Sequence, residues 1–123
     1  MLSESLLVTT IAVADLDEAR RFYGEQLGLA LLDETPFALR FGAGDGSQVS
    51  VRRGQPNAGQ TAGHFEVTDL NAEMAALRSR GVVFEEYDFP GLKTENGIAD
   101  IDGERAAWFI DSEGNILSIS QLT

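Results

Sequence analysis

The apolar and polar residues of this 123-residue chain follow a pattern that occurs twice in the same order. In the first half, the apolar and β-branched run Leu6–Val13 predicts a strand. Asp15 then precedes apolar residues at helical spacing, which predicts a helix capped by Asp15, with Glu18 in a capping box, that ends near Gly28. Three strands are expected after it, with a glycine-rich turn between the last two: Leu29–Glu34, Phe37–Phe41 and Gln48–Arg53.

The second half begins the same order again at Gly63. A strand is predicted at His64–Val67, and Asp69 caps a helix that ends at Gly81. Further strands are expected at Val82–Tyr87, Ala106–Ile110 and Ile116–Ser120, with extra chain at Asp88–Ile101. The repeat predicts an α+β fold in a single domain, residues 1–123, made of two modules at about 5–54 and 61–121.

Three segments of the chain resemble a known superfamily when they are taken in order. They are Val13–Tyr23, Phe65–Leu70 and Phe109–Asn115, and they resemble the glyoxalase, bleomycin-resistance and extradiol dioxygenase superfamily, also called vicinal oxygen chelate. The resemblance implies two βαβββ modules that form an open, curled mixed sheet with a central cleft, in a homodimer.

Metal-dependent members of that superfamily have a histidine seven residues before the helix-capping aspartate and a carboxylate on the last strand of a module. In this chain the four corresponding positions hold Val8, Ser50, Ala62 and Ser118. Methyl and hydroxyl groups do not supply the imidazole, thiolate or carboxylate ligands that hold a transition metal. The resemblance therefore implies a member without the usual metal site, and we expect no cofactor.

Side chains that alternate along a strand face opposite sides of its sheet. Residues with the parity of the four family positions should therefore line the cleft and bind a ligand: Thr10, Arg40, Ser50, Arg52, His64, Glu66, Trp108 and Ser118. Residues of the other parity should form the core: Leu7, Ile11, Val13, Phe41, Phe65, Val67 and Phe109.

His64 is the only histidine, so it is the candidate for acid–base work or for a hydrogen bond to a ligand. The alternative is a hydrogen-bonded structural residue. Glu66, on the same face, is a candidate partner for His64 or for a cationic ligand, and its alternative is a cross-strand pair with Arg40 or Arg52. A new metal site at His64 and Glu66 lacks an identifiable third ligand.

Trp108, the only tryptophan, offers an aromatic plane on which a flat ligand or a cation can stack. The alternative is that it fills a dimer interface or the core. The segment Tyr87–Lys93 combines aromatic residues with proline and glycine, as a lid over a site does. Its alternative is a structural crossover that packs its aromatic residues onto the edge of the sheet.

Charge and composition exclude several partners. The formal net charge of -11 repels phosphate backbones and anionic lipid, so neither nucleic acid nor a membrane is expected, and a cationic ligand would suit this charge. No apolar run approaches the ~18 residues of a membrane span. The stretch Met1–Thr10 has no basic residue ahead of its apolar segment, unlike a signal peptide, so a cytoplasmic protein is expected.

Motifs exclude some chemistry and leave three hypotheses. The chain has no cysteine, and therefore no disulfide, thiolate nucleophile or zinc–cysteine site. It also has no nucleophile elbow, phosphate loop or dinucleotide motif. We favour a protein that binds a small molecule in the cleft without metal. The alternatives are a glyoxalase-type lyase or isomerase, or another enzyme of the superfamily, and a non-catalytic interaction module.

Overall fold

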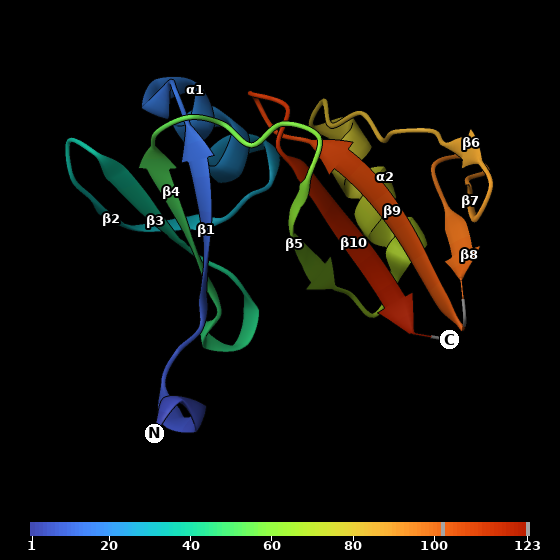
Figure 1. The fold of residues 1–123 in the computed structure, drawn as a ribbon, viewed down its shortest axis with the longest axis horizontal. Helices are drawn as coiled ribbons and strands as arrows, with labels where there is room; N and C mark the ends of the chain where they lie inside the picture. Colours follow the sequence, from blue (N-terminus) through green and yellow to red (C-terminus); the bar gives the residue numbers. More distant parts are fainter. Residues whose placement is uncertain (102, 123) are drawn as a thin grey trace.

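The chain folds into two modules that lie side by side (Figure 1). The computed structural model describes residues 1–101 and 103–122, so the last residue of the predicted domain lies outside the described part. The first module contains a short turn of helix η1 (Leu2–Glu4), β1 (Val8–Val13), α1 (Leu16–Arg20), a π-helical continuation η2 (Arg21–Gln26), β2 (Ala30–Glu34), β3 (Ala38–Gly42), η3 (Gly44–Gly46) and β4 (Gln48–Arg53). The second contains β5 (Thr61–Glu66), α2 (Leu70–Ser79), β6 (Asp88–Phe89), β7 (Leu92–Lys93), β8 (Ala99–Ile101), β9 (Glu104–Ile110) and β10 (Ile116–Leu122).

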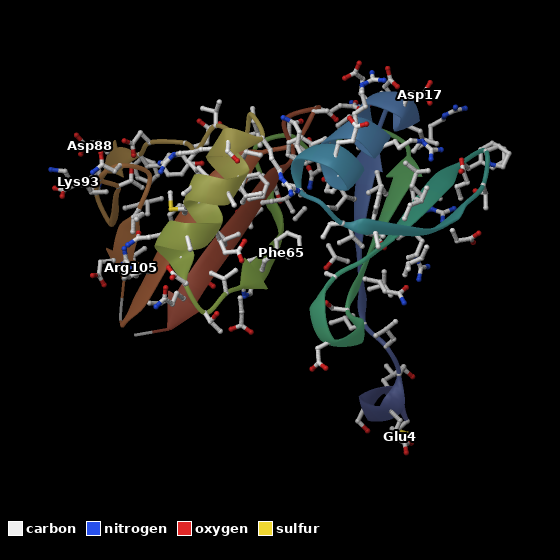
Figure 2. All side chains as sticks on the ribbon, turned by 180° about the vertical axis from the view of Figure 1, so that it is seen from behind. Glu4, Asp17, Phe65, Asp88, Lys93 and Arg105 are labelled. Atoms are coloured by element: carbon white, nitrogen blue, oxygen red, sulfur yellow. The ribbon has the colours of Figure 1, made fainter. Side chains whose placement is uncertain are left out.

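Each module has one four-stranded mixed sheet with the same topology. The strand orders are β1-β4-β3-β2 and β5-β10-β9-β8, and in each sheet the first strand of the module runs parallel to its last. Figure 2, seen from behind, shows α2 lying over the second sheet. The predicted α+β fold of two βαβββ modules is confirmed. No helix in the described ranges is long and apolar enough to cross a membrane.

The predicted helix boundaries are confirmed, but one half of the predicted capping box is wrong. The Asp15 side chain accepts hydrogen bonds from the backbone N–H groups of Asp17 and Glu18, and Gly28 has a φ of 75° where the left-handed conformation favours glycine. The Glu18 carboxylate, however, pairs with Arg21. The Asp15 N–H donates to Glu113 of the second module instead, at 2.8 Å.

The predicted strand at Val82–Tyr87 is also wrong. In this segment only Phe84 forms a bridge, to Phe109, while β8, inside the predicted extra chain, pairs with the other end of β9. A tight turn at Asn96 and Gly97, with φ values of 54° and 82°, reverses the chain just before β8. An Asn-Gly pair is a strong hairpin signal, so the sequence did carry evidence for this edge strand.

The core lies between the helices and the sheets, and most of the residues predicted for it are confirmed. Phe41 and Phe109 are fully buried, and Phe65 and Val67 pack on the same cluster. The prediction for Leu7 is wrong, because 90% of its surface is exposed. The first pair of the β1–β4 ladder is Val8 with Gln48, so Leu7 precedes the sheet and has no packed neighbour across it.

The two modules are joined by the turn between β9 and β10. Asp111 and Asn115 are buried in this turn. The Asp111 carboxylate accepts a hydrogen bond from the Tyr23 hydroxyl at 2.8 Å, and the Asn115 amide donates to the Ala12 carbonyl at 2.9 Å. The Glu113 carboxylate accepts from the backbone N–H groups of Ala14 and Asp15. We call Asp111, Glu113 and Asn115 the junction turn.

Replacing Asn115 with alanine should lower the free energy of unfolding by about 3 kcal/mol or more, because it leaves buried hydrogen-bonding groups without partners. The Asn115 side chain bonds to the Ala12 carbonyl, to Asp111 and to the Asn57 backbone N–H. Urea unfolding measures the change. Asn57→Ala, which keeps the backbone N–H, is the matched control and should cost less than about 0.5 kcal/mol. Equal effects of the two substitutions would contradict the role of the junction turn.

Candidate functional site

In each module the face of the sheet opposite the helix is left bare, and a buried serine lies at its centre. In the first sheet, Ser50 is 5% exposed and lies beside Thr10 on β1 and Arg40 on β3. In the second sheet, Ser118 is 7% exposed and lies beside His64 and Trp108. The repeat in sequence therefore produces two equivalent positions in space, each surrounded by different chemistry.

A pocket of about 490 Å³ lies on the bare face of the first sheet, and we call it the arginine pocket. It brings together three of the predicted site residues, Arg40, Ser50 and Arg52. Its remaining lining residues are Leu32, Asp33, Thr35, Phe37, Ala38, Leu39 and Gln48. Thr10 lies on the same face, exposed, on the neighbouring strand β1.

A smaller pocket of about 200 Å³ lies on the bare face of the second sheet, and we call it the tryptophan pocket. It brings together His64, Trp108 and Ser118 of the predicted set, and its other lining residues are Ile101, Glu104, Ala106 and Ser120. The Trp108 indole is half-buried and the His64 imidazole is exposed. Neither ring has a hydrogen-bond partner within the described part of the chain, so their N–H groups are available to a ligand.

Glu66 is separated from the rest of the predicted set. It lies opposite Ser120 at the end of β5, so it is in the other sheet from Arg40 and Arg52, and the alternative of a cross-strand pair with them is wrong. It lines a third pocket, of about 300 Å³, which lies between the modules; we call it the apolar pocket. Figure 2 shows Phe65, another residue of this lining, on the side of the second module that faces the first.

An aromatic row borders the tryptophan pocket. The Trp108 and Tyr87 rings meet edge to face with centroids 5.7 Å apart, and Tyr87 meets Phe89 in the same way at 5.8 Å. Burial raises the pKa of the Tyr87 hydroxyl, and the nearby Glu85 carboxylate raises it further. The segment Tyr87–Lys93 thus contains a small β6–β7 hairpin, and its aromatic side chains extend the row edge to face from Trp108.

The four positions where the superfamily places metal ligands do not offer a suitable donor set. Val8 and Ala62 carry only methyl groups, and Ala62 falls at a bulge in the pairing of β5 with β10. Ser50 and Ser118 carry hydroxyls, which do not hold a transition metal without imidazole or carboxylate ligands. In residues 1–101 and 103–122, moreover, no group of three or more His, Cys, Asp or Glu side chains is placed to hold a metal ion.

Sequence reasoning missed several residues of these surfaces, among them Gln48 and Tyr87. Gln48 lines the arginine pocket and, together with His64, a small pocket of about 80 Å³ between the modules. Its position two residues before Ser50 on the same strand was the available signal, since residues i and i+2 share a face. Tyr87 was considered as part of a lid or of a crossover packed on the edge of the sheet, and its contact with Trp108 was not predicted because the two residues lie in distant segments.

Comparison with known proteins identifies related folds. The family model described as Glyoxalase/Bleomycin resistance protein/Dioxygenase superfamily matches residues 5–115. TnmS3, an antibiotic binding protein from Streptomyces sp. CB03234, superimposes with a TM-score of 0.77 at 23% identity, over 100% of this chain and 99% of that chain. A putative glyoxalase family protein from Bacillus anthracis gives 0.76 at 15% identity, over 98% and 96%. A comparison with curated proteins finds no match.

Both tyrosines of the chain should resist ionisation in the folded protein. Burial raises the pKa of the Tyr23 hydroxyl above its ordinary value of 10.0, and the Asp111 carboxylate that it bonds raises it further. With Tyr87 shifted in the same direction, fewer than half of the tyrosines should be ionised at pH 10. Ultraviolet difference spectra measure this, with guanidinium-unfolded protein as the control, in which about half should be ionised.

The sign of the linkage follows from the raised pKa of Tyr23. Its contribution to stability is fully present below the pKa of the unfolded chain, about 10, and is lost as the pH rises through the folded-state pKa. Tyr23→Phe removes this titration and leaves that of Tyr87. Native protein that is already half ionised at pH 10 would contradict the buried hydrogen bond.

Proposed function

We propose that this chain, which belongs to the glyoxalase/bleomycin resistance protein/dioxygenase superfamily, binds a small molecule on the bare faces of its sheets without a metal. The observation that carries the proposal is the Trp108 indole, whose N–H has no hydrogen-bond partner among the described residues and which lines a pocket beside a buried serine. A planar ligand stacked there would gain dispersion contacts with the Trp108 ring.

Polar groups around this aromatic surface would orient the ligand. His64 is exposed on the same face, and its imidazole can donate or accept a hydrogen bond. The hydroxyls of Ser118 and Ser120 line the floor. Ligand sites in proteins combine a mostly apolar lining with a few polar groups of this kind. Glu66 stays a candidate for contact with a charged group of a ligand, but in the apolar pocket between the modules.

Metal-free binding is supported by the donor set at the family positions. Valine, alanine and two serines at these positions cannot provide several strong ligands to one ion. The description of TnmS3 as an antibiotic binding protein supports a small organic compound as the class of ligand. Because the likeness to that protein is one of fold, the identity of the compound stays open.

A homodimer in the cytoplasm, expected from the sequence, is part of the same proposal. The N-terminal segment before β1 extends away from both sheets (Figure 1), and its large apolar side chains Leu2, Leu6 and Leu7 are exposed. Apolar side chains gathered on such a segment favour burial against another surface, and a second copy of the chain supplies one.

Planar aromatic compounds should include some that stabilise the protein saturably and change the fluorescence of its single tryptophan, Trp108. At a ligand concentration about 100 times Kd the stabilisation should be about 2.7 kcal/mol. Thermal unfolding and fluorescence titration measure the two effects. Both should be unchanged by a chelator. A broad set of such compounds that leaves both signals unmoved would contradict the proposal, as would stabilisation that a chelator abolishes.

Four substitutions test whether the ligand lies on the second sheet. Ser118→Leu should remove binding by filling the pocket, whereas Ser112→Leu, on the exposed turn, is the matched control and should not. Trp108→Leu should weaken binding about tenfold or more, while Trp108→Phe keeps an aromatic face and should lose less. Calorimetry measures these affinities, and equal affinity in all four variants would show that the ligand lies elsewhere.

A further inference from the structure

The arginine pocket is positively charged in a strongly negative protein. Its lining contains Arg40 and Arg52 against a single carboxylate, Asp33, which gives it a formal net charge of +1. The whole chain carries -11. Two cations on one face of a sheet are therefore a local exception to the charge of the molecule and need an explanation.

Neither arginine forms an ion pair with a carboxylate of the described residues. The ion pairs found there lie elsewhere, and they join Met1 to Glu4, Arg20 to Glu34 and Arg21 to Glu18. Asp33 is the cross-strand partner of Arg40, but a register shift in β2 next to it disturbs the pairing. Arg52 lies between Ala12 and Ala38, whose methyl groups offer no charge.

The groups around these arginines are mainly hydrogen-bond donors. Arg40 donates from Nη1 to the Gln48 amide oxygen at 2.7 Å, which uses one of the five N–H groups of its guanidinium. That bond also leaves the NH₂ group of Gln48 as a donor. The Thr35 hydroxyl oxygen already accepts from the backbone N–H groups of Phe37 and Ala38. The Ser50 hydroxyl adds a further donor at the centre of the face.

The positions of the two guanidiniums suit one shared anion. Arg40 lies opposite Ser50, and Arg52 follows Ser50 by two residues on β4, so the arginines are diagonal neighbours on one face, about 7–8 Å apart at the backbone. Long side chains bridge that separation easily. Like charges this close repel each other, and an anion between them removes the repulsion.

We infer that the arginine pocket binds an organic anion, whose carboxylate or phosphate group bonds to Arg40 and Arg52. Guanidinium groups match the geometry of both anions with paired N–H donors. Leu32 and Phe37, which are 54% and 61% exposed, line the same pocket and take the apolar body of the ligand. This inference rests on the proposed function, since it assigns a negative charge to the ligand, whereas the net charge of the chain favours a cation.

Matched aryl compounds that differ only in charge test the inference. The probes are 2-naphthoate, 2-naphthyl phosphate, neutral 2-naphthamide and a naphthylmethylammonium salt, with inorganic phosphate alone as the anion without an apolar body. The readout is the side-chain Nε–Hε signals of ¹⁵N-labelled protein. The two aryl anions should shift the Arg40 and Arg52 signals saturably, inorganic phosphate more weakly, and the amide and ammonium compounds not at all.

Arg53 provides a matched control, because it is an exposed arginine next to Arg52 whose side chain alternates to the other face of β4 and does not line the pocket. Arg40→Gln and Arg52→Gln should each weaken naphthoate binding about tenfold or more, and Arg53→Gln less than about twofold. Arg52 is exposed, so its substitution keeps the fold intact, and circular dichroism verifies this for all three variants.

Three outcomes would overturn the inference. The neutral amide could bind as well as the aryl anions, or Arg53→Gln could weaken binding as much as Arg40→Gln and Arg52→Gln. The arginine signals could also shift with protein concentration alone, which would assign this face to a second copy of the chain. The Trp108 signal separates the inference from the proposed function. An aryl ligand that quenches Trp108 with an affinity that Arg40→Gln and Arg52→Gln leave unchanged would support the proposed function and overturn the anionic class of its ligand. Anions that shift the arginine signals, while no aromatic compound affects Trp108, support the anion site and overturn the tryptophan pocket.

Discussion

The arrangement of the two modules depends on the buried hydrogen bonds of the junction turn. Asp111 accepts from Tyr23 of the first module while also bonding to Asn115 and to the backbone of its own turn. Glu113 binds the backbone at the start of α1, where a helix leaves N–H groups without partners. A buried carboxylate without such donors would be strongly unfavourable, so separating the modules exposes several unsatisfied groups at once. These bonds, together with the hydrophobic core that the two modules share, hold the two sheets side by side.

The corresponding contact, between the helix of the second module and a turn of the first, lacks these hydrogen bonds, and a pocket lies there instead. When the two modules are aligned on their helix-capping residues, Asp15 and Asp69, Tyr23 falls on Leu77. When their last turns are aligned, Asp111 falls on Ala43. The hydrogen bond from Tyr23 to Asp111 is thus replaced by two apolar side chains, one of them a single methyl group. Both residues line the apolar pocket of about 300 Å³ between the modules. The molecule is therefore tied by polar bonds at one junction and left loosely packed at the other, because the two copies of the module have diverged at these positions.

The repeated pattern of strands and helix caps was sufficient to predict most of the elements, and strand parity was sufficient to predict the faces of the sheets, since both are local properties. Parity predicted one cleft for Arg40, Ser50, Arg52, His64, Trp108 and Ser118, whereas the structure divides them between two pockets. It was insufficient wherever the outcome depended on distant segments. The carboxylate that accepts from the Asp15 backbone N–H belongs to Glu113 rather than to Glu18. The same side of β9 pairs with Phe84 at one end and with β8 at the other. No local sequence pattern indicates these contacts, apart from the Asn-Gly turn ahead of β8.

The divergence of the modules also explains why the two pockets differ in chemistry. Equivalent positions in the two sheets hold Thr10 and His64 beside Ser50 and Ser118, so the scaffold at the centre is nearly the same. The neighbouring strands then supply Arg40 in one sheet and Trp108 in the other. A small serine at each centre leaves room above the sheet, so a ligand at that position requires no rearrangement of the core behind it. The two serines that stand at the family's carboxylate positions are thus also the residues that leave this space.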